Sequence, residues 1–195
     1  MARPIRKRED IEVGVVRVVA EKGLHATTIQ DIAQAAEVSP GLLYRYWKNR
    51  DDLAREVYER LYRQLVGELI ERAGAYDDPW DQLTQMLRGF LAFADRQPVE
   101  LRFLLLAQHD LARSVPLEAG ILQYLTGVIS GAVPAGGETP APVIAQMALG
   151  IILQPVVGVL YGDLPGPPSR YGDTLEQAIQ TLLQTQAQPA EQASS

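Results

Sequence analysis

Apolar residues recur at helical spacing along almost the whole chain, and no stretch alternates between apolar and polar positions as a half-buried strand would. Interruptions rich in Gly, Pro and Asp separate these apolar stripes and mark the helix boundaries. The pattern predicts an all-α protein with about nine helices. We expect these helices near residues 9–22, 29–36, 40–47, 51–73, 79–96, 99–111, 114–132, 143–161 and 169–186.

Residues 27–50, TTIQDIAQAAEVSPGLLYRYWKNR, contain two short helical patterns. Thr28 can cap the first helix, because its hydroxyl can accept from the free N–H groups of the first turn. The buried stripe of that helix consists of Ile29, Ile32, Ala33 and Ala36. Glu37 and Val38 then interrupt the pattern, which predicts a tight turn.

The second short helix begins at Ser39 as the cap and Pro40 as the first helical residue, where a missing N–H costs nothing. Leu43 and Trp47 are four residues apart and are expected to face inward. The outward positions are Leu42, Arg45 and Tyr46. Two helices of about two turns joined by a short turn form a helix-turn-helix, whose second helix reads the major groove of DNA.

The distribution of charge agrees with this interpretation, although the net charge of −6 does not. Residues 1–50 carry nine Lys or Arg and six Asp or Glu, whereas residues 51–195 carry nine basic and eighteen acidic residues. A basic head can neutralise phosphates, and an acidic remainder is repelled by them. Residues 1–8 are expected to be either a flexible arm along the DNA or a frayed, solvated tail.

The same stretch resembles the N-terminal signature of TetR-family transcriptional repressors. The matching positions are Thr27, Thr28, Ile32, Ala33, Ala36, Val38, Ser39, Gly41, Leu43, Tyr44, Tyr46, Trp47, Arg50 and Leu53. They cover about a quarter of the chain. Glu37 departs from the family, which commonly has Gly there, and a side chain at a left-handed turn position costs about 1 kcal/mol.

The resemblance and the outward positions together give the candidate DNA contacts. They are Thr28, Gln30, Ser39, Pro40, Gly41, Leu42, Tyr44, Arg45, Tyr46, Lys48 and Arg50. Arg45 is the best candidate for base reading, because its two-pronged guanidinium matches O6 and N7 of guanine. Arg50 stands where the family usually has a Lys that contacts a phosphate.

The remainder is expected to be an effector-binding and dimerisation body. Aromatic and polar side chains in apolar surroundings are the candidate ligand contacts, with ordinary core packing as the alternative for each. They are Met86, Phe90, Phe93, Phe103, His109, Tyr124, Met147, Gln154 and Tyr161. Gln154 is expected to be a buried amide near the kink at Pro155, or else to bond across a dimer seam.

Catalysis, metal binding and membrane insertion have little support. The chain has two histidines far apart and no cysteine, and no H-x-x-x-H pattern or acidic cluster occurs. We therefore expect no enzyme activity, no cofactor and no metal. Residues 143–161 are very apolar, but Gln146, Gln154 and Pro155 interrupt them, which favours a helix buried in protein. The basic start has no apolar segment behind it, so no secretory signal is expected and the cytoplasm is the expected location.

These observations predict three regions: a DNA-binding head over 1–47, a helical body over 48–187 and a disordered tail over 188–195. The resemblance implies a homodimer joined through the last two helices and a palindromic DNA operator. It also implies release from DNA by a small effector, which the candidate contacts suggest is largely apolar or amphipathic. The alternative is a helical small-molecule-binding protein or adaptor that does not bind DNA.

Overall fold

The computed structural model describes residues 4–111, 118–133 and 139–187, and this part of the chain forms nine α-helices and one short 3₁₀-helix without any strand. The all-α prediction is therefore confirmed. The helices divide between two compact units. Unit 1 takes its described residues from 1–64 and 97–118, and unit 2 from 65–96 and 119–195. The predicted functional division after residue 47 stays a prediction.

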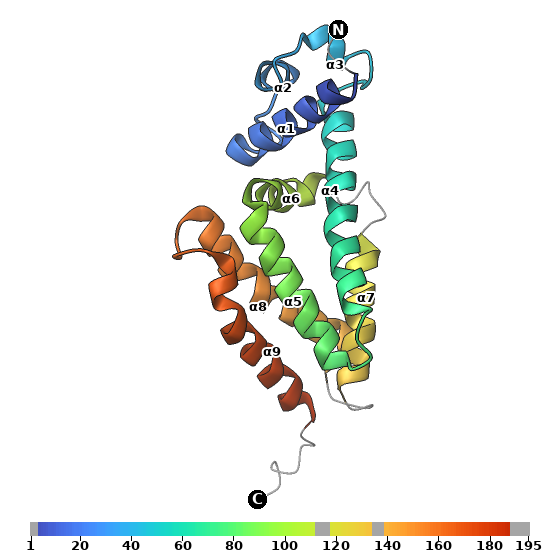
Figure 1. Ribbon diagram of the computed structural model, residues 1–195, viewed down its shortest axis with the longest axis vertical. Helices are drawn as coiled ribbons and strands as arrows, with labels where there is room; N and C mark the ends of the chain where they lie inside the picture. The colour runs from blue at the N-terminus through green and yellow to red at the C-terminus, as the bar shows by residue number, and fades with distance from the viewer. Residues whose placement is uncertain (1–3, 112–117, 134–138, 188–195) are drawn as a thin grey trace, which may run out of the picture. The chain divides into compact units, whose positions relative to one another are not determined.

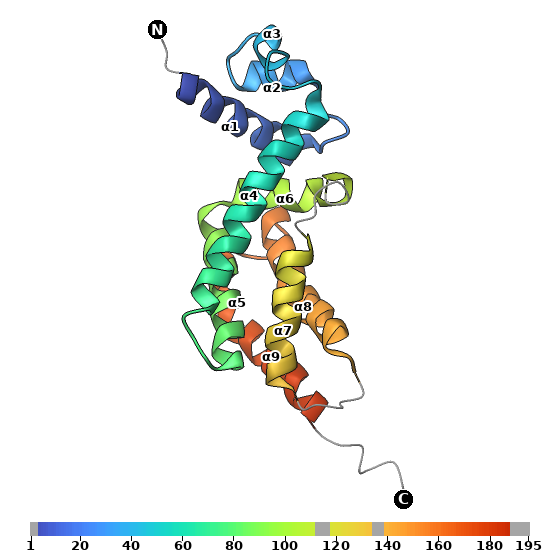
Figure 2. The ribbon, with the colours of Figure 1, turned by 90° about the vertical axis from the view of Figure 1, so that its right-hand side faces the viewer.

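In unit 1, α1 (Pro4–Lys22) packs against α2 (Ile29–Ala35) on one side and α6 (Pro98–Leu111) on the other (Figures 1 and 2). The remaining elements of this unit are α3 (Pro40–Leu43) and the first part of α4 (Arg50–Ala73). Helix α1 begins earlier than predicted, so the expectation of an arm or tail over residues 1–8 is wrong for residues 4–8. Its end is as predicted: Gly23 has φ +78° and its N–H donates to the carbonyl of Val19 at 2.8 Å.

The core of unit 1 is built from the apolar stripes that the sequence predicts. The side chains buried there include Ile11, Val15, Val19, Ile32, Leu43, Leu53, Val57 and Phe103. Tyr58 packs on Phe103 with ring centroids 6.4 Å apart, which joins α4 to α6. The two shortest helices are too short to be stable alone, so their conformation depends on this shared core.

In unit 2, α5 (Pro79–Arg96) packs against α8 (Ala141–Tyr161), η2 (Pro168–Tyr171) and α9 (Gly172–Ala187) (Figure 1). Helix α7 (Glu118–Ala132) and the last part of α4 also belong to it. Arg88 on α5 pairs with Glu176 on α9 at 2.8 Å, and Arg96 pairs with Glu68 at 3.0 Å. The predicted tail, residues 188–195, lies outside the described residues.

Helix α8, expected to be buried in protein, is only partly buried within the chain. One face is buried, through Ile144, Ala145, Ala148, Val156 and Gly158. Another remains open, with Val143 and Met147 each 47% exposed. By length and composition alone α8 could cross a membrane, and 22% of its apolar window is buried within the chain. The sequence pattern could not distinguish burial within one chain from burial against a partner, because both require the same apolar side chains.

Candidate nucleic-acid interface

Helix α2 begins with a complete capping box. The Thr28 hydroxyl oxygen accepts from the N–H of Asp31 at 3.2 Å, and the Asp31 carboxylate accepts from the N–H of Thr28 at 2.7 Å. The carboxylate also accepts from the Thr28 hydroxyl at 2.6 Å and pairs with Lys22 of α1 at 2.7 Å. The hydrogen bond from Lys22, followed by those from Thr28, lowers the pKa of Asp31 from 3.8 to about 2. Asp31 therefore fixes the start of α2 and ties it to α1.

The turn between α2 and α3 centres on Glu37, which has φ +52°. Its N–H donates to the carbonyl of Gln34 at 3.2 Å, and the N–H of Val38 donates to the carbonyl of Ala33 at 2.9 Å. These bonds close the end of α2 in the way that a left-handed residue permits. The sequence-based expectation that Glu37 occupies a left-handed turn position is confirmed.

The second helix of the pair is shorter than predicted. Helix α3 spans four residues, and the chain continues as turns through Tyr46. The N–H of Trp47 nevertheless donates to the carbonyl of Leu43 at 3.0 Å, so helix-like bonding reaches the end of the predicted segment. Leu43 is fully buried and Trp47 is 8% exposed, which confirms that both face inward.

Burial of Leu43 and Trp47 turns the intervening side chains outward. Tyr44 is 56% exposed and Tyr46 is 65% exposed, and Arg45 between them is exposed as well. Trp47 is fixed from the inside, because its Nε1–H donates to the Glu56 carboxylate of α4 at 2.8 Å. Glu56 also pairs with Arg8 of α1. The exposed aromatic and basic group is thus carried on a segment held by two other helices.

Of the predicted DNA contacts, the exposed ones are Thr28, Gln30, Ser39, Pro40, Gly41, Tyr44, Arg45, Tyr46 and Lys48, and Leu42 is half-buried. They lie at the start of α2 and along α3 and the turns after it, and these two helices lie side by side in unit 1 (Figures 1 and 2). Their contact with DNA stays a prediction. Arg50 differs, because its guanidinium is directed at backbone carbonyls of the segment before α2.

The predicted effector contacts differ in burial, and their contact with an effector stays a prediction. Phe103 lies in the core of unit 1, whereas Met86 and Phe93 are buried in α5 and Phe90 beside them is half-buried. Met147, Gln154 and Tyr161 are exposed on α8, so the expected burial of Gln154 within the chain is wrong. The side chain of His109 lies outside the described residues. Tyr124 lines a groove on α7.

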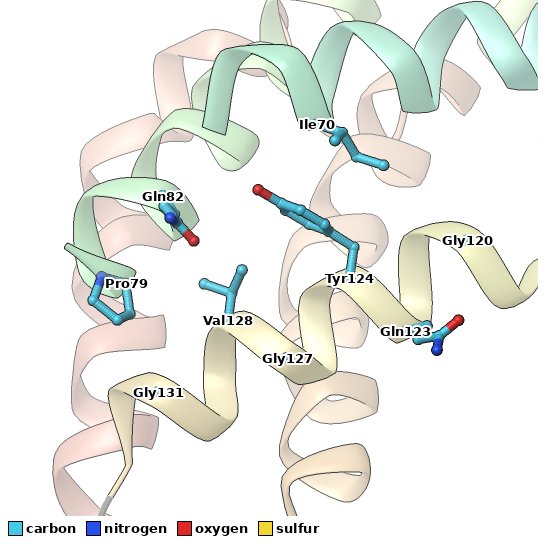
Figure 3. A pocket seen from close by; sticks show the side chains of 9 residues that line it. All are labelled: Ile70, Pro79, Gln82, Gly120, Gln123, Tyr124, Gly127, Val128 and Gly131. Carbon is cyan, nitrogen blue, oxygen red and sulfur yellow. The ribbon is translucent and has the colours of Figure 1, made fainter. Parts of the chain in front are cut away.

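That groove lies in unit 2, between α7 and the adjacent ends of α4 and α5, and has a volume of about 530 Å³. Its lining residues are Ile70, Pro79, Gln82, Gly120, Gln123, Tyr124, Gly127, Val128 and Gly131. Figure 3 shows the Tyr124 ring reaching from α7 into the space between Ile70 and Gln82. The glycines were not predicted from the sequence, although Gly120, Gly127 and Gly131 recur on one face of α7 with Tyr124 and Val128.

Comparison with known proteins gives matches to bacterial regulators. Residues 15–57 match the family profile described as "Bacterial regulatory proteins, tetR family". The chain is 29% identical over 111 residues to the probable acrEF/envCD operon repressor of Escherichia coli K12, covering 55% of this chain and 50% of the relative. The match thus spans about half the length of that curated relative.

Solved structures resemble the chain over nearly its full length. The fatty acid degradation regulator FadR from Bacillus halodurans aligns with a TM-score of 0.77 at 19% identity, covering 92% of this chain and 96% of that one. FadR from Bacillus subtilis in complex with stearoyl-CoA aligns with a TM-score of 0.69 at 18% identity, covering 88% and 96%. At these identities the likeness concerns the fold.

We predict that Asp31 stabilises the protein in a pH-dependent way. Because its folded pKa of about 2 lies below the ordinary 3.8, its contribution is fully present above pH 3.8 and is lost as the pH falls toward 2. The difference in unfolding free energy between wild type and Asp31→Asn should be constant near neutral pH and shrink between about pH 4 and pH 2. Urea unfolding across this range measures it, with the exposed Asp77→Asn as a control. An equal difference at both pH extremes would contradict this role.

Glu37→Gly should stabilise unit 1 by ~1 kcal/mol, because glycine adopts a positive φ without strain. Glu37→Ala removes the same charge but keeps the Cβ atom, so it should give no such gain. Urea unfolding of both variants separates backbone strain from electrostatics. Equal stabilisation by the two substitutions would show that the charge matters and the strain does not.

Proposed function

Because residues 15–57 carry the tetR-family domain and the chain shares the fold of solved TetR-family regulators, the protein is a member of the TetR family, and we propose that it is a ligand-responsive transcriptional repressor. It binds a palindromic operator as a homodimer in the cytoplasm, and a small, uncharged, largely apolar effector releases it. The proposal includes no catalytic step. The main support is the exposed group Tyr44–Arg45–Tyr46, which follows α3. The buried side chains of Leu43 and Trp47 flank this group and hold it in place.

The chemistry of this exposed group suits duplex DNA. Tyrosine hydroxyls donate to phosphate oxygens, and the Arg45 guanidinium can donate to both acceptors on the major-groove edge of guanine. Leu42 beside them is half-buried and can touch a thymine methyl group. Lys48 adds an exposed positive charge. A general protein-binding surface would not need this combination of base-edge and phosphate donors.

The exposed face of α8 supports the proposed homodimer. Val143 and Met147 lie on it, and Tyr161 at its end is 46% exposed. Large apolar side chains exposed on a helix of this apolar character, with Gln154 among them, are consistent with an interface that another protein covers. We propose that α8 and α9 of a second copy cover it, in place of a membrane. Two-fold symmetry of the dimer would then require a palindromic operator.

The groove on α7 supports the effector part of the proposal. Its volume falls within the range of about 300–1,000 Å³ that is usual for small-molecule sites. Among the described residues that line it, none is Asp, Glu, Lys, Arg or His. These described lining residues offer no cation for the phosphates of a ligand such as the stearoyl-CoA bound by one structural neighbour. We propose an uncharged effector whose polar group bonds Tyr124 or Gln123.

Binding to duplex DNA distinguishes the repressor from a helical ligand-binding protein that lacks DNA binding. The wild type should bind a random-sequence duplex with an affinity that falls steeply as salt rises. Once an operator is known, Arg45→Ala should cost ~1–3 kcal/mol of discrimination at one base-pair position per half-site. Fluorescence anisotropy measures both quantities. Absence of duplex binding at low and moderate salt would contradict the repressor, and an unchanged base preference in Arg45→Ala would contradict base reading by Arg45.

Gly127→Leu should block the groove without disturbing the fold, because a Cβ atom at Gly127 meets nothing within 4 Å. Gly67→Leu on α4 is the matched control, since that position is equally open and lies outside the groove. With the uncharged dye Nile red as the probe, we expect at least about tenfold weaker binding in Gly127→Leu, equivalent to about 1.4 kcal/mol, and no change in Gly67→Leu. Equal dye binding by both variants would exclude the groove as the apolar site.

A further inference from the structure

Arg50, the first residue of α4, is bound on every nitrogen of its guanidinium. Its Nη1 donates to the carbonyl of Thr27 at 2.8 Å and to that of His25 at 3.3 Å. Its Nε donates to the Asp51 carboxylate at 2.7 Å, and its Nη2 lies 2.6 Å from the same carboxylate oxygen. The side chain is 26% exposed. All three guanidinium nitrogens, and the positive charge they share, thus interact with groups of the protein itself.

The carbonyls that Arg50 holds belong to the connection between α1 and α2. Carbonyls in such a connection have no helical partner and need a donor from elsewhere. Thr27 is 1% exposed, and its hydroxyl donates to the carbonyl of Gly23 at 2.8 Å. Thr28, the cap of α2, follows directly. The position of residues 25–27 therefore determines where α2 begins, and Arg50 fixes that position from α4.

A second side chain of α4 holds the other end of residues 27–47, which we call the DNA-reading segment. Glu56 accepts from Nε1 of Trp47, directly after the exposed Tyr44–Tyr46 group. The segment between residues 27 and 47 is consequently tied at both ends to the first turns of α4, at Arg50 and at Glu56. Any displacement of the start of α4 would be passed to both ends of this segment.

We propose that Arg50 is a positioning residue of the DNA-reading unit and does not itself bind a phosphate. This inference rests on the proposed function, because it assigns a role within DNA binding. It departs from what the TetR resemblance implies for this position, where a Lys usually meets the phosphate. A lysine ammonium is a single point charge, whereas the planar guanidinium can bind two carbonyls and a carboxylate together. The Arg at this position thus serves to join α4 to the α1–α2 connection.

The test compares Arg50→Gln with Lys48→Gln in the full chain, using two readouts. Titration of a random-sequence duplex at several salt concentrations gives the slope of log affinity against log salt, which falls in magnitude by about 0.9 for each phosphate that the protein no longer neutralises. Hydrogen exchange of the amides in residues 24–31 is measured without DNA. Lys48→Gln should reduce the slope by about 0.9 and leave exchange unchanged. Arg50→Gln should leave the slope unchanged. The amides of residues 24–31 should exchange at least about tenfold faster in this variant than in the wild type.

A slope reduced by about 0.9 in Arg50→Gln overturns the proposal, whatever the exchange result, and so does unchanged exchange. Arg50→Lys provides a second variant if the Gln variant folds poorly: it should keep the slope but recover only part of the exchange protection. Full recovery of protection by Lys would also contradict the proposal, because one ammonium would then suffice. If the wild type does not bind DNA, the proposed function fails, while the exchange measurement still tests whether Arg50 holds residues 25–27.

Discussion

Burial of Leu43 and Trp47 in the core of unit 1 is the constraint on which the proposed DNA-reading segment, residues 27–47, depends. Helices α2 and α3 are too short to be stable alone, so their geometry is set by what they pack against. With Leu43 and Trp47 turned inward, the residues between them must face outward. The exposure of Tyr44, Arg45 and Tyr46 is therefore a consequence of core packing. Other side chains could replace these three without changing the fold.

Helix α4 runs from the core of unit 1 into unit 2. Its first turns supply Arg50 and Glu56, which hold the two ends of the reading segment, and Leu53 and Val57, which join the same core. Near its other end, Ile70 lines the groove on α7. One continuous helix thus contributes both to the proposed DNA reader and to the proposed effector site. An effector that favours one placement of α4 would change DNA affinity by linkage, which is the basis of the proposed regulation.

The sequence predicted most of the helices and the turn between α2 and α3, because these depend on local spacing. The stripes of α1 and α4, the cap at Thr28, the left-handed turn at Glu37 and the inward side of α3 all follow from positions a few residues apart. It failed where the answer depends on distant neighbours. Helix α8 has an apolar surface whether a partner covers it or not, and Gln154 could not be assigned to an inner or outer face.

The direction of Arg50 and the groove were missed for the same reason. An arginine beside a basic, aromatic segment can face phosphate or backbone equally well by sequence, and only the fold brings the Thr27 carbonyl within 2.8 Å of its Nη1 atom. The groove is formed in large part by glycines, which give no hydrophobic signal, and by residues from three helices. Tyr124 lines this groove, whereas Phe93 and Phe103 are buried in the cores, Phe90 is half-buried on α5 and Tyr161 is exposed on α8.

We propose that a two-fold dimer of this chain reads DNA through the segment held by Leu43 and Trp47. Selection of bound sequences from a random duplex pool by the purified full chain tests it most directly. We expect enrichment of an inverted repeat whose half-sites are separated by whole helical turns, about 10 base pairs or a multiple of it. A pool that shows no enrichment, or enrichment of a single unrepeated site, would contradict it.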